Sequence, residues 1–202
     1  MMAQDFGKRI SKKKRQIVST ATDLFTKHGL KRVTVEEICQ RAGASKMTFY
    51  KYFPNKMALF RHIMNGMIED GYKKLYEIDA IDIPFREKMQ KLIQYKIELG
   101  SKMNREFINE MLGPVPETMD FWQEIQVKNC QLFIDFVTKA QGRGDIRKMR
   151  PEFILAVFNK LLELILDEDL RKIYTDYAEF IREVNSFFFF GILPVEKQEH
   201  RE

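Results

Sequence analysis

The feature that most constrains this chain is a succession of helix start and stop signals within its first sixty residues. Gly29 ends an amphipathic stretch whose apolar residues recur at helical spacing. Thr34 and Ser45 are N-cap residues for two further helices, which Gly43 separates and Pro54 ends. Two short helices joined by a glycine-containing turn predict a helix-turn-helix motif. The apolar stripe that precedes the motif comprises Ile17, Ala21, Leu24, Phe25 and His28.

The internal positions of this motif suit close packing of its two helices. Thr34 followed by Glu37 predicts a capping box, in which each side chain accepts a hydrogen bond from the other residue's backbone N–H. Cys39 falls where the helices cross and a small side chain is needed, so we interpret it as a core residue in preference to a redox thiol. The shared apolar contact is expected from Ile38, Ala42 and Phe49.

Charge is divided unevenly along the chain. Residues 1–60 hold 13 Lys and Arg against 4 Asp and Glu, a formal charge of +9. The remaining 142 residues hold 21 against 25, a formal charge of −4. An uneven solvated surface would also produce such a division. Together with the helix-turn-helix pattern, however, the division favours a polyanion-binding head joined to a body with another task.

The second short helix has a polar and aromatic outer face. Lys46 and Thr48 can donate hydrogen bonds to base edges or phosphates, and the hydroxyls of Tyr50 and Tyr52 can reach phosphate oxygens. The alternative for either tyrosine is packing between domains. Such a face is poor core material and favours insertion of the helix into a DNA groove.

These residues also carry a family resemblance. The region is similar to the DNA-binding domain of the TetR/AcrR family of transcriptional regulators over about residues 8–62. The resemblance implies an all-helical dimeric repressor whose divergent C-terminal domain binds a small effector. The matching segments are Ala21-Thr22-Asp23-Leu24-Phe25, His28-Gly29, Thr34-Val35-Glu36-Glu37-Ile38, Ala42-Gly43-Ala44-Ser45-Lys46 and Thr48-Phe49-Tyr50-Lys51-Tyr52-Phe53-Pro54-Asn55-Lys56.

The resemblance further implies which residues contact DNA. Thr34 and Lys56 look like phosphate contacts at helix N-termini, and Tyr50 and Tyr52 look like phosphate contacts beside the recognition helix. Met47 stands where the family often has Gly or Pro, which leaves the operator sequence open. The candidate DNA-binding residues are Thr34, Ser45, Lys46, Met47, Thr48, Tyr50, Tyr52 and Lys56.

The rest of the chain shows helical periodicity and no strand alternation, so the predicted fold class is all-α. We expect a helix-turn-helix DNA-binding domain over residues 1–60 and a helical effector-binding and dimerisation domain over residues 61–202. Breaker residues divide the second domain into candidate helices. These helices cover about 55–77, 85–102, 104–112, 117–140, 151–167 and 174–191. The acidic run Asp167 to Asp169 is expected to be a solvated turn.

The last two candidate helices are the most apolar. The run from Phe187 to Phe190 presents apolar surface on every side, more than one neighbouring helix can bury. We expect these helices to form a four-helix dimer interface, and the alternative is a monomeric core wrapped by the preceding helices. The candidate interface residues are Phe153, Val157, Leu161, Leu164, Phe180, Val184, Phe187 and Phe188.

An effector pocket is expected among the helices spanning about 85–140, beside a Pro-rich break. Met and aromatic side chains adapt to the shape of a small hydrophobic effector, although any one such residue is more often plain core. The candidate pocket residues are Phe107, Met111, Phe121, Trp122 and Ile125.

Several function classes find no support in the sequence. His28, His62 and His200 are scattered, and we find no catalytic triad, phosphate loop or metal-ligand spacing, so we expect no catalytic residues, no metal and no cofactor. No apolar run approaches the length of a membrane span and no signal peptide precedes the basic stretch, which predicts a cytoplasmic protein. The expected function is a homodimeric repressor that a hydrophobic effector releases from a palindromic operator. The alternative is a constitutive or structural DNA-binding protein without an effector.

Overall fold

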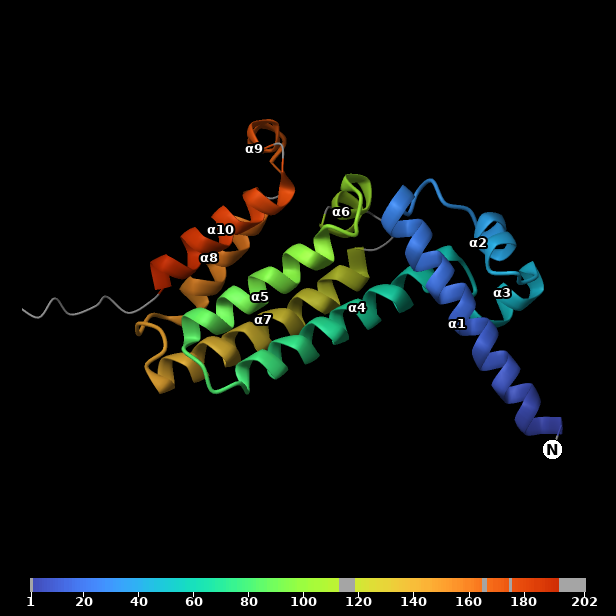
Figure 1. Ribbon diagram of the computed structural model, residues 1–202, viewed down its shortest axis with the longest axis horizontal. Helices are drawn as coiled ribbons and strands as arrows, with labels where there is room; N and C mark the ends of the chain where they lie inside the picture. The colour runs from blue at the N-terminus through green and yellow to red at the C-terminus, as the bar shows by residue number, and fades with distance from the viewer. Residues whose placement is uncertain (1, 113–118, 165–166, 175, 193–202) are drawn as a thin grey trace, which may run out of the picture. The chain divides into compact units, whose positions relative to one another are not determined.

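The computed structural model describes residues 2–112, 119–164, 167–174 and 176–192, and every regular element within these ranges is an α-helix (Figure 1). This confirms the all-α prediction. Among the described residues, no helix combines the length and the apolar character that crossing a bilayer requires. The helices are α1 (Met2–His28), α2 (Val35–Arg41), α3 (Lys46–Tyr52), α4 (Lys56–Asp79), α5 (Phe85–Gly100), α6 (Arg105–Leu112), α7 (Met119–Arg143), α8 (Pro151–Leu164), α9 (Glu168–Ile173) and α10 (Tyr177–Ile192).

Internal contacts divide the chain into two compact units. The head unit comprises Met1–Lys73 and Lys102–Phe121, and the body unit comprises Lys74–Ser101 and Trp122–Glu202. The division expected at residue 60 falls inside α4, whereas the contacts divide the chain farther along that helix. They also group α6 with the head unit.

The head unit is built on the apolar stripe of α1. Ile17, Ala21 and Phe25 have no exposed surface, and Leu24 is 2% exposed. Gly29 follows the helix with a φ of +80°, the left-handed conformation expected at this C-terminal position, and its N–H donates to the carbonyl of Phe25 at 2.9 Å. The stripe anchors the C-terminal half of α1, and Gly29 marks the point where the chain turns toward α2.

Helices α2 and α3 form the predicted helix-turn-helix. The hydroxyl of Thr34 accepts from the N–H of Glu37 at 3.1 Å, and the hydroxyl of Ser45 accepts from the N–H of Thr48 at 3.1 Å. Gly43 lies between them with a φ of +58°. Cys39 is 4% exposed, and burial raises the pKa of its thiol, which fits a core residue.

The body unit holds an aromatic core formed by α5, α7, α8 and α10. The rings of Phe133 and Phe158 stack with their centroids 5.0 Å apart, and Phe188 lies 5.4 Å from Phe158. Such pairs add about 0.5–1.5 kcal/mol each beyond the burial of their surface. The buried residues of this cluster are Phe85, Met89, Val137, Ala140, Ile146, Ile154 and Phe188.

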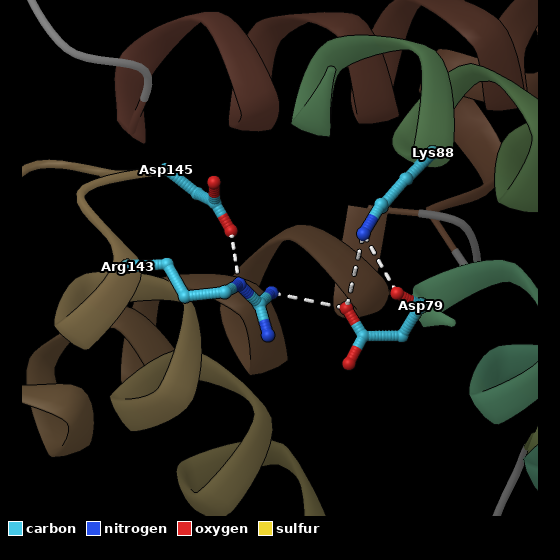
Figure 2. A network of polar contacts seen from close by, with 4 residues as sticks. All are labelled: Asp79, Lys88, Arg143 and Asp145. Carbon is cyan, nitrogen blue, oxygen red and sulfur yellow. Dashed lines mark hydrogen bonds and ion pairs between the residues drawn. The ribbon is translucent and has the colours of Figure 1, made fainter. Parts of the chain in front are cut away.

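A polar network fastens the end of α4 to α5 and to the end of α7 (Figure 2). Arg143 donates from Nη2 to Oδ1 of Asp79 at 3.0 Å and from Nε to Oδ2 of Asp145 at 2.6 Å. Lys88 donates from Nζ to the carbonyl of Asp79 at 2.6 Å, and its Nζ lies 3.9 Å from Oδ1 of the same residue. Lys88 is buried, so these contacts compensate a charge that would otherwise destabilise the unit.

One local prediction was confirmed only in part, since Thr34 caps α2 without the reciprocal contact from Glu37, and another was wrong. The carboxylate of Glu37 pairs with Arg41 at 3.0 Å instead of completing the capping box, because a Glu followed four residues later by Arg is a favourable helical pair. The acidic run after α8 begins a helix and is not a simple turn. Oδ1 of Asp167 accepts from the N–H groups of Asp169 and Leu170 at 2.9 Å and so caps α9.

Candidate nucleic-acid interface

The outer face of α3 is exposed, although the helix is anchored by a fully buried ring. Phe49 has no exposed surface, whereas Met47 is 85% and Tyr50 is 53% exposed. The ring of Tyr50 packs edge-on against Phe49 with a centroid distance of 5.4 Å, while half of the residue stays exposed. Tyr52 is half-buried, with its ring 6.5 Å from that of Phe53. The helix therefore exposes the thioether of Met47 together with the phenol of Tyr50, whose ring is held by Phe49.

The start of α3 is fixed by two hydroxyls. Besides capping the N–H of Thr48, the hydroxyl of Ser45 lies 2.9 Å from the hydroxyl of Thr48, and either group can be the donor. Ser45 is exposed and Thr48 is half-buried. Each hydroxyl retains further hydrogen-bonding capacity toward an incoming phosphate or base edge.

Lys46 is held by an acidic neighbour in the unbound protein. Its ammonium forms an ion pair with the carboxylate of Glu36, and both side chains are more than half exposed. The shared hydrogen bond lowers the pKa of Glu36 and raises the pKa of Lys46. Solvent screens an exposed pair of this kind, so exchanging the carboxylate for a phosphate costs little.

Lys56 uses its ammonium inside the head unit. Its Nζ donates to the carbonyls of Leu30 and Val33, each at 2.8 Å, and burial lowers its pKa. The side chain therefore fixes the loop between α1 and α2. The phosphate contact expected at Lys56 consequently rests on its backbone N–H at the start of α4. The hydroxyl of Thr34 is likewise engaged in capping α2.

A basic hollow between α1 and the end of α2 was not predicted from the sequence. It has a volume of about 530 Å³ and is open to solvent. Oε1 of Gln16, in its wall, is buried and has no hydrogen-bond partner among the described residues. The signal was present as a polar stripe at i, i+3, i+4, i+7 and i+8 along α1, opposite the apolar stripe. The lining residues are Lys12, Arg15, Gln16, Ser19 and Thr20 of α1, Arg41 at the end of α2 and Ala42.

The candidate effector-pocket residues are distributed over both units. Phe107 is fully buried in the head unit, with its ring edge-on to Phe60 at 6.3 Å. Phe121 is buried in the same unit beneath the guanidinium of Arg61, 5.9 Å from its ring centroid. Met111 is half-buried in the head unit, and the half-buried Trp122 and Ile125 belong to the body unit. The pocket formed by these five residues stays a prediction.

A groove in the body unit was not anticipated. It lies between α5 and α10 and has a volume of about 280 Å³. Its apolar lining consists of Met89, Ile93, Ile97 and Phe189, and its polar lining consists of Arg86, Gln90, Gln94, Arg182 and Ser186.

The candidate dimer residues differ sharply in exposure. Phe187 is 75% and Phe153 is 56% exposed in the single chain. Phe180 and Phe188 are buried within the body unit itself, so their rings stabilise the single chain. The half-buried members are Val157, Leu161, Leu164 and Val184.

The chain is similar in sequence to known regulators over more than half of its length. Residues 17–63 match the family described as "Bacterial regulatory proteins, tetR family". Over 120 residues, 56% of each chain, the protein is 31% identical to the HTH-type transcriptional regulator RutR of Escherichia coli (strain K12). It is 25% identical over 142 residues to a "Probable acrEF/envCD operon repressor" of the same strain, covering 59% of this chain and 64% of that one. The chain spans about half the length of the first curated relatives it matches.

The fold is similar to that of solved regulators over nearly the whole chain. The SmeT–triclosan complex aligns with a TM-score of 0.67, covering 91% of this chain and 93% of that one at 17% identity. This likeness concerns the arrangement of helices, because the sequences have diverged.

Proposed function

We propose that this chain is a homodimeric repressor of the TetR/AcrR family, whose model matches residues 17–63, and that a small molecule releases it from a palindromic operator. The observation that carries the proposal is the division of α3 into one buried ring and an exposed outer face. A seven-residue helix buries Phe49 completely and leaves Lys46, Met47 and Tyr50 exposed. Such a helix contributes one anchor to the core and offers its remaining side chains to a partner.

The exposed side chains suit the chemistry of a DNA groove. Lys46 can exchange the carboxylate of Glu36 for a phosphate or a guanine edge, and the methyl end of Met47 can contact a thymine methyl group. The phenol of Tyr50 can donate to a phosphate oxygen. The basic hollow, with Lys12, Arg15 and Arg41 in its walls, would follow the sugar–phosphate backbone beside the groove.

A dimer is proposed because a single head unit reads one half-site. Two-fold symmetric readers of this kind bind half-sites separated by one helical turn of DNA, roughly 34–36 Å. The exposed rings of Phe153 and Phe187 supply apolar surface for pairing of two body units. Burial of such rings yields roughly 25 cal/mol per Å² of surface removed from water.

We propose release by a small molecule because the chain has a second compact unit besides the head unit that would bind DNA. The structure related in fold, the SmeT–triclosan complex, holds a small ligand. A ligand weakens DNA binding by the ratio of its affinities for the DNA-competent and DNA-incompetent states. The alternative, a constitutive DNA-binding protein, requires no such ligand. It predicts the same DNA affinity in the presence of every compound.

The central experiment is fluorescence anisotropy with a palindromic duplex selected from random sequence by the purified protein. We expect binding to the selected duplex to be at least about a thousandfold tighter than to scrambled DNA at the same salt concentration. Lys46→Ala should weaken specific binding, and Lys91→Ala, an exposed substitution on α5, should not change it. Equal affinity for selected and scrambled duplexes would contradict the proposal.

A further inference from the structure

The groove between α5 and α10 combines an apolar floor with two guanidinium groups. Its floor on α5 consists of Met89, which is buried, and Ile93 and Ile97, which are half-buried. Arg86 and Arg182, both exposed, belong to the same lining. No described Asp or Glu is among the residues that line the groove. The groove therefore offers apolar surface and positive charge to one ligand.

Regular helical spacing makes this lining continuous. The α5 residues follow Arg86 at i+3, i+4, i+7, i+8 and i+11, so they form one stripe along the helix. Ser186 and Phe189 follow Arg182 at i+4 and i+7 and share one face of α10. Each helix thus contributes a single face to the groove.

The two helices run in opposite directions along the groove. Met89, near the start of α5, packs in the cluster that holds Phe188, near the end of α10. Ile97, near the end of α5, packs against the cluster that holds Phe180, near the start of α10. The two arginines of the lining therefore lie toward opposite ends of the groove, with the apolar floor between them.

The two ends differ in their electrostatic surroundings. At one end, Nη2 of Arg182 lies 3.7 Å from Oδ2 of Asp176, and Glu98 accepts a hydrogen bond at 2.9 Å from a glutamine of the lining. At the other end, Arg86 lies in the first turn of α5, where the aligned backbone dipoles favour an anion. Glu87, the next residue, is not part of the lining. An entering carboxylate is therefore better placed beside Arg86.

The groove uses a different face of α10 from the expected dimer surface. Successive helical residues are about 100° apart, so Phe187 leaves α10 about a third of a turn from the line through Arg182, Ser186 and Phe189. The volume of about 280 Å³ lies just below the range of roughly 300–1,000 Å³ that is typical of small-molecule pockets. Both observations favour a small ligand over a second copy of the chain.

The chemistry of the lining indicates what this ligand carries. A guanidinium pairs with a carboxylate through two parallel hydrogen bonds, which a hydroxyl cannot reproduce. The half-buried floor favours a hydrocarbon, because covering it removes apolar surface from water. A ligand with both features is an amphiphilic organic acid.

We propose that the groove between α5 and α10 binds a small organic acid, whose carboxylate pairs with Arg86 and whose hydrocarbon part covers Met89, Ile93 and Ile97. The inference rests on the proposed function in that this acid would be the releasing effector. It narrows the expected hydrophobic effector to an amphiphilic anion. It also places the ligand apart from the five pocket residues that the sequence suggested.

The test is calorimetry and thermal unfolding of the full chain with a fixed panel of probes. The panel comprises straight-chain carboxylates from butanoate to decanoate, benzoate and phenylacetate, all below their critical micelle concentrations, and the alcohol matched to each acid. We expect at least one acid to bind and raise the Tm, with its matched alcohol binding at least about tenfold more weakly. Failure of every acid to bind the wild-type chain would overturn the proposal.

Two arginine variants locate the carboxylate. Arg86→Gln should weaken binding of that acid at least about tenfold and leave binding of the alcohol unchanged, because only the charged contact is lost. Arg182→Gln, in the same lining, is the matched control and should weaken the acid less than about threefold. Equal acid binding by wild type and Arg86→Gln would overturn the proposal. A larger loss in Arg182→Gln would do so too, as would loss of alcohol binding in Arg86→Gln.

A third variant separates a ligand groove from a surface between two copies. Ser186→Trp adds a large ring to the lining and should remove binding of acid and alcohol alike, without changing the molecular mass in light scattering. Undiminished binding to Ser186→Trp would place the acid elsewhere and overturn the proposal. Dissociation of a dimer by Ser186→Trp would show that a second copy covers the groove, which would also overturn it.

Failure of this inference and failure of the proposed function give different results. Specific DNA binding by the unliganded protein tests the regulator alone. Acid binding that depends on Arg86 tests the site alone. If the acid binds through Arg86 but leaves DNA affinity unchanged, the site stands and effector release is refuted.

Discussion

Replacing Glu110 should destabilise the head unit more than any exposed acidic substitution. This residue on α6 is 6% exposed, and its carboxylate accepts the N–H of Leu30 and, at 3.0 Å, the N–H of Lys31. Hydrogen bonds to a charged group contribute roughly 1.5–3 kcal/mol each. At the lower figure, Glu110→Ala should reduce the free energy of unfolding by about 3 kcal/mol. Glu110→Gln retains one acceptor oxygen and should lose about half as much.

The assay is urea unfolding combined with amide hydrogen exchange, which reports directly on the two N–H groups. In Glu110→Ala, the amides of Leu30 and Lys31 should exchange much faster while amides in the body unit keep their protection. Glu106→Ala, one turn earlier on α6 and exposed, is the control and should change stability by less than about 0.5 kcal/mol. Unchanged exchange at Leu30, or equal losses for Glu106→Ala and Glu110→Ala, would refute the reasoning.

Three further predictions concern the helix-turn-helix and the proposed dimer surface. Tyr50→Phe should leave the Tm unchanged and weaken specific DNA binding roughly tenfold in anisotropy, because the exposed phenol donates a hydrogen bond of about 1 kcal/mol or more to phosphate. Unchanged affinity would exclude that contact. Gly43→Ala should lower the free energy of unfolding in urea by about 1–2 kcal/mol, because alanine is strained at a φ of +58°. An added Cβ would cause no clash, since its nearest atom, Nζ of Lys13, is 3.9 Å away. An unchanged free energy of unfolding would show that the turn adapts. Phe187→Ser should convert the dimer to a folded monomer in light scattering, since 75% of the residue is exposed in the single chain; a persistent dimer would place the interface elsewhere.

Local signals in the sequence predicted the head unit in detail. Thr34 and Ser45 cap α2 and α3, as predicted. Gly29 and Gly43 adopt the left-handed backbone conformation, which suits their positions at a helix end and in a turn. These features depend on a few neighbouring residues, so a short window of sequence contains all the information they need. Glu37 shows the limit of such a window, because two local partners competed and the helical pair with Arg41 prevailed over the capping box.

Three lysines show why the binding surfaces could not be read in the same way. Lys56, Lys88 and Lys96 all occupy helical positions that polarity alone assigns to solvent. In the structure, Lys56 fixes carbonyls of the preceding loop, Lys88 is neutralised by Asp79, and Lys96 faces an aromatic ring far along the chain. Each outcome is set by the residue that folding brings opposite the ammonium. Helical periodicity specifies only the direction in which a side chain leaves its own helix. Because the charge is the same in all three, the partner decides whether the ammonium is bound by carbonyls, paired with a carboxylate or placed against an aromatic ring.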